Sequence, residues 1–141
     1  MDLPDPIDIA SLQHTLQTVA SEWVRMLELR VERAVPGEVE LALPVTPRHV
    51  HGGGVLCGQT LMSAADTAII LAVTSKLGGF RPMTTVQLQT SFLRPVPAHT
   101  GEVRVIARVL RLGRSLVFGE VHITAPGGEL AAHATTTYAL L

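Results

Sequence analysis

The sequence predicts an α+β domain in which an antiparallel sheet wraps around one long buried helix. One observation is the run Leu61–Leu77, which consists almost entirely of apolar and small residues. A second is the succession of strand-like segments after that run, separated by glycine and proline turns. A chain of 141 residues with 47% hydrophobic residues is sufficient for one domain with its own core.

The N-terminal part is expected to contain a helix and two strands. Pro6–Val19 is predicted to be a short amphipathic helix, and residues 1–20 a helical extension of a core formed by residues 21–141. Trp23–Ala34 is predicted to be a strand, and Pro36-Gly37 a turn. Glu38–Leu43 alternates between polar and apolar residues, as a second strand does.

The central helix is expected after a loop over Pro44–Gly54. It runs from about Gly58 to Leu77, and Gly78-Gly79 ends it. Four strands should follow: Thr85–Leu93, Glu102–Leu112, Ser115–Thr124 and Glu129–Leu140. In the first of them, Val86 and Leu88 are expected on one face and Thr85 on the other.

Composition argues against several kinds of partner. A formal net charge of −1, 4% aromatic residues and no basic stripe argue against nucleic-acid binding. The single Cys57 excludes an intrachain disulfide and a CxxC pair. The acidic start Met1–Asp5 lacks a signal-peptide pattern, and Asp66 interrupts the longest apolar run, so no membrane span is expected. We therefore expect a cytoplasmic protein.

Asp66 is the most informative residue. On a helix it shares the apolar face of Met62, Ile69, Ile70 and Val73, so its carboxylate should point into a core or pocket. A carboxylate removed from water must be paired, hydrogen-bonded or protonated, and in that setting it often takes part in chemistry. Asp66 is thus a candidate base or nucleophile, and a structural buried carboxylate is the alternative.

Glycines surround the start of the same helix. Gly53–Gly58 permits close approach of a ligand, and the Gly58 N–H is a candidate to polarise a carbonyl oxygen. Gly58 and Asp66 are eight residues apart, about 12 Å along a helix. One carbonyl cannot contact both, so joint action requires a homodimer with sites at its interface. His51 near the helix start and Thr85 on the next strand are further candidates, for orienting substrate or water.

Metal and cysteine chemistry receive less support. His49 and His51 form an HxH pair, but no cysteine or carboxylate stands at a spacing that would complete a metal site, so none is expected. Cys57 lacks an evident base partner and is more consistent with a small residue near the site than with a nucleophile.

The segment from Cys57 to Ala68 resembles the helix start of the hotdog-fold thioesterases, specifically the PaaI-like acyl-CoA thioesterases of the phenylacetate pathway. Ser91–Pro95 and Leu110–Phe118 resemble that family's third strand and its turn between the fourth and fifth strands. The resemblance covers roughly residues 38–140. It implies a hotdog fold and hydrolysis of an acyl-CoA to a free acid and CoA, without a metal or redox cofactor, so that coenzyme A enters only as part of the substrate.

The resemblance also implies roles for residues. Asp66 matches the catalytic carboxylate, and Gly58 the glycine that polarises the thioester carbonyl from the other subunit of a dimer. His51 stands fifteen residues before Asp66, where the family has Asn or Gln, and Thr85 falls near the family's water-positioning Ser or Thr. Cys57-Gly58-Gln59 replaces the family's His-Gly-Gly. Arginines at strand ends and a turn are candidates for contacting the CoA phosphates: Arg94, Arg111 and Arg114.

Other functions stay open at this point. A hotdog hydratase or dehydratase needs a histidine paired with a carboxylate, but Leu71 occupies the position where the Asp-x4-His pattern requires His. A His51–Asp66 pair across a dimer would restore that reading. A binding protein for acyl-CoA without turnover is a third possibility. The acyl group, the choice between nucleophile and general base, and a dimer or a dimer of dimers are also open. An apolar pocket is expected from Met62, Ile69, Ile70, Val73, Phe80 and Met83.

Overall fold

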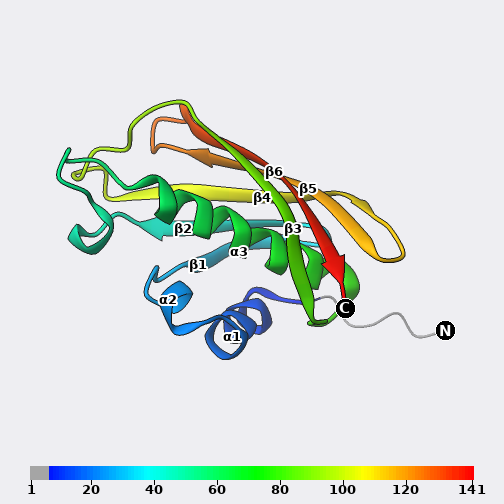
Figure 1. Cartoon of the computed structure of the whole chain (residues 1–141). Helices are drawn as coiled ribbons and strands as arrows, with labels where there is room; N and C mark the ends of the chain where they lie inside the picture. The colour runs from blue at the N-terminus through cyan, green and yellow to red at the C-terminus, as the bar shows by residue number, and fades with distance from the viewer. Residues whose placement is uncertain (1–6) are drawn as a thin grey trace.

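A six-stranded antiparallel sheet wraps around one long helix, α3 (Gly58–Leu77), in the computed structural model, which describes residues 7–141 (Figure 1). The strand order across the sheet is β1-β2-β4-β5-β6-β3. The strands are β1 (Arg30–Val35), β2 (Glu38–Pro44), β3 (Met83–Phe92), β4 (Glu102–Leu112), β5 (Leu116–Thr124) and β6 (Leu130–Leu140). The expected α+β architecture is confirmed, and the last four strands lie within a few residues of their predicted bounds.

The central helix is buried along most of its length. Its alanines Ala64, Ala65, Ala68 and Ala72 are fully buried, and small side chains permit close packing on the sheet. Ile69 lies so close to β5 that a Cβ on Gly119 would be 2.6 Å from its Cδ1. By length and composition α3 could cross a membrane, but 67% of its most apolar window is buried inside the fold, as in a core helix. The helix ends at Gly78, which adopts the left-handed conformation with φ 81°.

The N-terminal region corrects one prediction. The helix α1 spans Ile9–Val19, and Asp8 caps it by accepting a hydrogen bond from the Ser11 N–H at 2.7 Å. The predicted strand Trp23–Ala34 is wrong in its first half, where Glu22–Arg25 form a short helix, α2. The Ser21 side chain caps α2, and Glu28 at φ 58° then redirects the chain into β1. Residues 1–6, which include the acidic start and the predicted first helical residue Pro6, lie outside the described region.

The loop expected over Pro44–Gly54 contains a short 3-10 helix, η1 (Pro47–His49), and otherwise has no regular structure. A short antiparallel bridge between Val50 and Leu56 closes the loop just before α3. This bridge fixes the backbone of the loop just before the N-terminus of α3.

Strand β3 forms one edge of the sheet and contains an irregularity. Among the described strands it pairs with β6 alone, and the register shifts between Thr85 and Gln87. The predicted alternation is therefore wrong at this point. Thr85 turns inward to contact α3 on the same side as the partly buried Leu88, while Val86 is 59% exposed. A bulge of this kind reorients single side chains, and here it directs the Thr85 hydroxyl to the helix.

Candidate active site

The carboxylate of Asp66 is partly buried on α3 and is held by two hydroxyl groups. Thr85 Oγ1 donates a hydrogen bond to Asp66 Oδ1 at 2.9 Å. The hydroxyl of Tyr138 donates to the same oxygen and also contacts the Asp66 backbone carbonyl oxygen at 2.9 Å. No partner for Asp66 Oδ2 is found within residues 7–141, so this oxygen is available to a substrate or a water.

Tyr138 is a site residue that the sequence analysis missed. It lies on β6 directly opposite Thr85 in the β3–β6 register, and its side chain is 1% exposed. Burial and, next, the charge of Asp66 raise the pKa of the Tyr138 hydroxyl far above its usual value. The hydroxyl therefore stays protonated and acts as a donor to Asp66. A tyrosine at an inward position of the last strand was the only local sequence signal.

An apolar cavity of about 260 Å³ opens beside Asp66, between α3 and the N-terminal helices. One wall of the cavity consists of Leu16 and Val19 from α1 and Val24 from α2. Of the residues predicted to line a pocket, Ile70, Phe80 and Met83 do so. Ile69 and Val73 lie instead in the core, 1% and 0% exposed, because they face the sheet. The N-terminal extension thus contributes directly to the surroundings of Asp66.

Gly58 is the first residue of α3 and lies in a different hollow. Its N–H finds no acceptor within the described residues, and Cys57 at the N-cap position provides no side-chain cap. A cleft of about 360 Å³ contains Gly58 together with Phe92 and Arg94. A Cβ at Gly58 would lie 3.2 Å from Phe92 Cζ, so the aromatic ring covers the glycine closely. A free N–H at the positive end of a helix can polarise a carbonyl oxygen.

His51 does not approach Asp66 within one chain. It is exposed in the loop before α3, where its Nδ1 accepts a hydrogen bond from the Gly53 N–H at 2.9 Å. His49, its neighbour in the HxH pair, is buried with Nε2 3.2 Å from the Met26 carbonyl oxygen. The two histidines therefore have separate local contacts and do not form a joint site.

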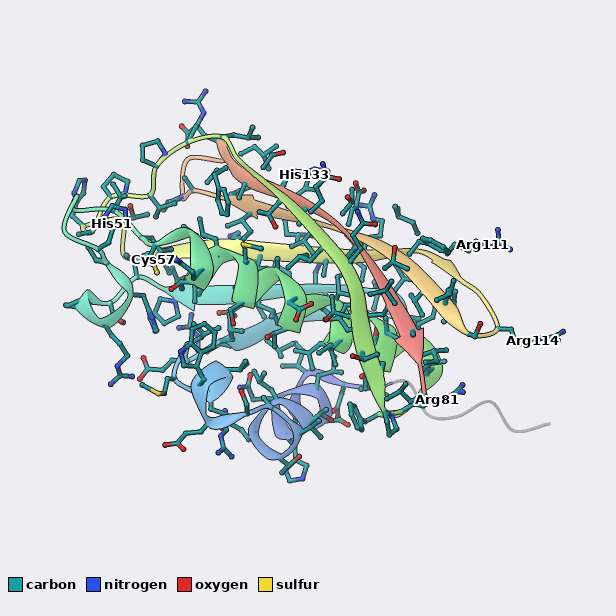
Figure 2. All side chains as sticks on the ribbon, viewed as in Figure 1. His51, Cys57, Arg81, Arg111, Arg114 and His133 are labelled. Carbon is teal, nitrogen blue, oxygen red and sulfur yellow. The ribbon has the colours of Figure 1, made fainter. Side chains whose placement is uncertain are left out.

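The three candidate arginines separate into two groups. Arg94 lines the cleft that contains Gly58. Figure 2 shows Arg111 and Arg114 at the β4–β5 hairpin, at the end of the molecule opposite His51 and Cys57. A single chain thus brings Asp66 together with Thr85, and Gly58 with Arg94. It does not join these two pairs to each other.

Comparisons with known proteins identify the family of the chain and its fold. Residues 49–132 match the model of the family described as the thioesterase superfamily. A conserved protein of Pseudomonas aeruginosa, PA5202, is 31% identical and superposes with a TM-score of 0.80 over 89% of this chain and 98% of its own. A variant of the phenylacetic acid degradation protein PaaI of Thermus thermophilus is 26% identical, with a TM-score of 0.72 over 86% of this chain and 100% of its own.

The thioesterase HI1161 of Haemophilus influenzae, 23% identical, shares the fold with a TM-score of 0.81 over 92% of this chain and 90% of its own. The resemblance of Cys57–Ala68 to the hotdog thioesterases is therefore confirmed by a family match over more than half of the chain. With its six strands around α3, the chain belongs to the thioesterase superfamily and is a hotdog-fold thioester hydrolase.

Proposed function

We propose that the protein is an acyl-CoA thioesterase that works as a homodimer, with Asp66 of one subunit and Gly58 of the other acting on the same thioester. The observation that carries the proposal is the Asp66 carboxylate, fixed by Thr85 and Tyr138 at the edge of an apolar cavity. A thioester has an apolar acyl part and an electrophilic carbonyl, and this site offers a cavity for the first and a carboxylate for the second.

In the proposed reaction, Asp66 Oδ2 takes a proton from a water molecule whose oxygen attacks the carbonyl carbon. The Gly58 N–H of the partner stabilises the negative charge that develops on the carbonyl oxygen. The carbon–sulfur bond then breaks, the thiolate receives the proton, and a free acid and CoA leave. In the alternative route, Asp66 itself attacks and a mixed anhydride is hydrolysed. A single turnover in heavy-oxygen water that places label in the Asp66 carboxylate identifies the second route with water attack at the Asp66 carboxyl carbon, because the first route labels only the free acid.

The length of α3 supports the proposal that two chains form each site. The helix is continuous from Gly58 to Leu77, so Gly58 and Asp66 are fixed about 12 Å apart along one axis. Within residues 7–141, the outer edge of strand β3 has no partner strand, and it bears exposed apolar side chains, including Val86 and Phe92, 59% and 50% exposed. Such an edge favours pairing with another strand. A two-fold axis at this edge would also cover Phe92, which packs over Gly58.

The surroundings also support an acyl-CoA as substrate. The cavity at Asp66 is lined mainly by apolar residues and can hold an acyl group. Arg94 in the Gly58 cleft can contact a CoA phosphate. Arg111 and Arg114 lie at the end of the folded molecule opposite His51 and Cys57 (Figure 2). They would therefore reach the same CoA only from the partner subunit. We propose no cofactor beyond the CoA of the substrate, and a cytoplasmic location, where acyl-CoA substrates are made and used.

A hydratase or dehydratase activity receives less support from the site. That chemistry needs a histidine near the carboxylate, but the partners of Asp66 within residues 7–141 are hydroxyl groups. The described lining of the adjacent cavity contains no histidine either.

The test is the substitution Asp66→Asn, which keeps the shape of the side chain and removes its basicity. Against a panel of short, long and aryl acyl-CoAs with a free-thiol readout, kcat should fall by about 10²- to 10⁴-fold. Asp8→Asn is the matched control, because asparagine caps a helix as well as aspartate does. Unchanged hydrolysis in Asp66→Asn would refute the assignment of the base. A wild-type protein that binds CoA esters without hydrolysing them would favour a binding protein.

A further inference from the structure

A cluster of two histidines and one glutamate lies on the outer face of the sheet, away from Asp66. His122 on β5 and His133 on β6 are direct partners in the register of the two strands, with ring centroids 5.0 Å apart. Glu120 precedes His122 by two residues and so lies on the same face. The neighbours Val121 and Ile123 are buried on the inner face. Figure 2 shows His133 on the side of the sheet opposite α3.

The distances within this cluster suit one small cation. Glu120 Oε2 lies 3.3 Å from His133 Nε2 and 3.7 Å from His122 Nε2, and all three ligand atoms lie within 4.8 Å of one another. Ligands about 2.0–2.1 Å from a tetrahedral zinc ion are separated by about 3.4 Å. The two distances from Glu120 are therefore near those of a zinc site. The third distance separates the ligand nitrogens of the two histidines, and a small rotation of His122, whose side chain is 46% exposed, can adjust it.

The electrostatic surroundings are compatible with a bound cation. The nearest arginine on the neighbouring strand, Arg108, is engaged by Glu38, with 3.3 Å between Nη2 and Oε1. A hollow of about 30 Å³ lined by Glu120, His122, Arg108 and Ile106 has room for a water molecule.

We propose that Glu120, His122 and His133 bind one Zn²⁺ ion per chain, with a water molecule as the fourth ligand. Two imidazoles and one carboxylate form a donor set that favours zinc over magnesium or calcium, which prefer sites made of oxygen ligands. The site is separate from the proposed active site, because β5 and β6 lie between it and the helix that carries Asp66. A zinc ion at this site would link β5 to β6.

The experiment is titration of metal-free full-length protein with Zn²⁺ by calorimetry, followed by Co²⁺ as a spectroscopic probe. The wild type should bind one ion per chain and, with Co²⁺, show the visible absorption of a tetrahedral complex. His133→Ala removes a ligand from an exposed face and should weaken the Kd by at least about 100-fold, more than the loss of an outer-shell contact does. Glu120→Gln should weaken binding in the same direction.

The matched control is His99→Ala, which removes an exposed histidine in the loop after β3 and should leave the Kd unchanged. Circular dichroism of each variant verifies that the fold is intact. The proposal is overturned if the wild type binds no Zn²⁺, or if His133→Ala binds as tightly as the wild type. It is also overturned if the complex contains one ion per two chains, or if a thiolate-to-cobalt absorption band shows that Cys57 is the ligand.

Discussion

Asp66 accepts hydrogen bonds at one carboxylate oxygen, Oδ1, and no partner of the other, Oδ2, is found among residues 7–141. Both hydroxyl donors, Thr85 and Tyr138, contact Oδ1, and they come from neighbouring strands that are paired in register. A carboxylate held in this way presents Oδ2 in a fixed direction, which reduces the entropy lost when a water is aligned for attack. Thr85 and Tyr138 are thus positioning residues in the proposed reaction.

The substitution Tyr138→Phe tests this role. It removes one donor to Asp66 and keeps the aromatic ring that fills the core, so the free energy of unfolding should decrease by only about 1 kcal/mol. Because the carboxylate becomes less restrained, kcat should fall by about 10- to 100-fold while KM changes little. Steady-state kinetics and urea unfolding measure the two effects.

Leu88→Ala serves as the control, because it removes a partly buried side chain of β3 that does not contact Asp66. It should lower stability without a comparable loss of kcat. If both variants lose kcat in proportion to their loss of stability, the Tyr138 hydroxyl has only a structural role.

The ionisation of Tyr138 can be followed directly, because it is the only tyrosine of the chain. Burial, together with the charge of Asp66, raises the pKa of this phenol, which is about 10 in an unfolded chain. Its contribution to stability is therefore complete below pH 10 and is lost as the pH rises above that value, where the unfolded state releases the proton first.

The phenolate absorbance of the folded protein should thus appear at higher pH than that of the urea-unfolded chain. Asp66→Asn should lower the pKa of Tyr138 only in part, because burial is the largest cause of the shift. Coincident titration curves for folded and unfolded protein would contradict the burial of this hydroxyl.

The sequence predicted the residues with a local signal and not those that depend on register. Asp66 was identifiable because it is the only acidic residue in a long apolar run. Tyr138 was missed because its contact with Asp66 spans 72 positions and depends on its pairing with Thr85. Likewise, His122 and His133 meet only through the β5–β6 register. Thr85 was predicted, but the bulge that turns it inward has no clear sequence pattern.

At the scale of elements, α2 shows where local patterns fail. Trp23–Ala34 was predicted to be a strand, yet only Leu27–Glu32 alternates, and Ser21 caps a short helix over Glu22–Arg25. The short helix places Val24 against the cavity at Asp66, and Leu27 and Leu29 in the core, 1% and 3% exposed. Tertiary packing thus decided between helix and strand. The long α3, with its many buried positions and a glycine stop, was predicted with accurate bounds.

The N-terminus of α3 allows the Gly58 N–H to be removed without breaking the helix. Gly58→Pro deletes this donor at the first helical position, where proline is favoured, and Cys57 already has the extended backbone that precedes proline. Gly58→Ala is the matched control, since it adds a Cβ in the same crowded place near Phe92 and keeps the N–H.

If the N–H polarises the thioester carbonyl, Gly58→Pro should lose about 10²- to 10³-fold in kcat relative to Gly58→Ala. The melting temperatures of the two variants should be similar. Equal kcat values in the two variants would show that crowding at Phe92, and not the N–H, accounts for any loss.

At the scale of the whole molecule, Asp66 and Gly58 lie in two separate hollows, which are the two half-sites of the proposed reaction. The Asp66 cavity lies between α3 and the N-terminal helices, and the Gly58 cleft lies at the start of α3 between β3 and the preceding loop. Neither half contains both a base and a carbonyl-polarising N–H. The proposed two-fold dimer with antiparallel α3 helices would join one half-site of each type at two equivalent places.

Heterodimers with two different tags test this arrangement, because each can be purified by both tags in turn. In a dimer of one Asp66→Asn chain and one Gly58→Pro chain, both changes fall in one composite site and the other site is intact. Activity should therefore be about half of wild type per dimer, although each variant homodimer is expected to keep at most about 1% of the activity. The reciprocal dimer pairs a chain that carries both changes with a wild-type chain. It should be inactive, because each of its sites then contains one altered residue. If Asp66 and Gly58 of the same chain acted together, the two results would be exchanged, so the pair of measurements distinguishes the two arrangements in either outcome.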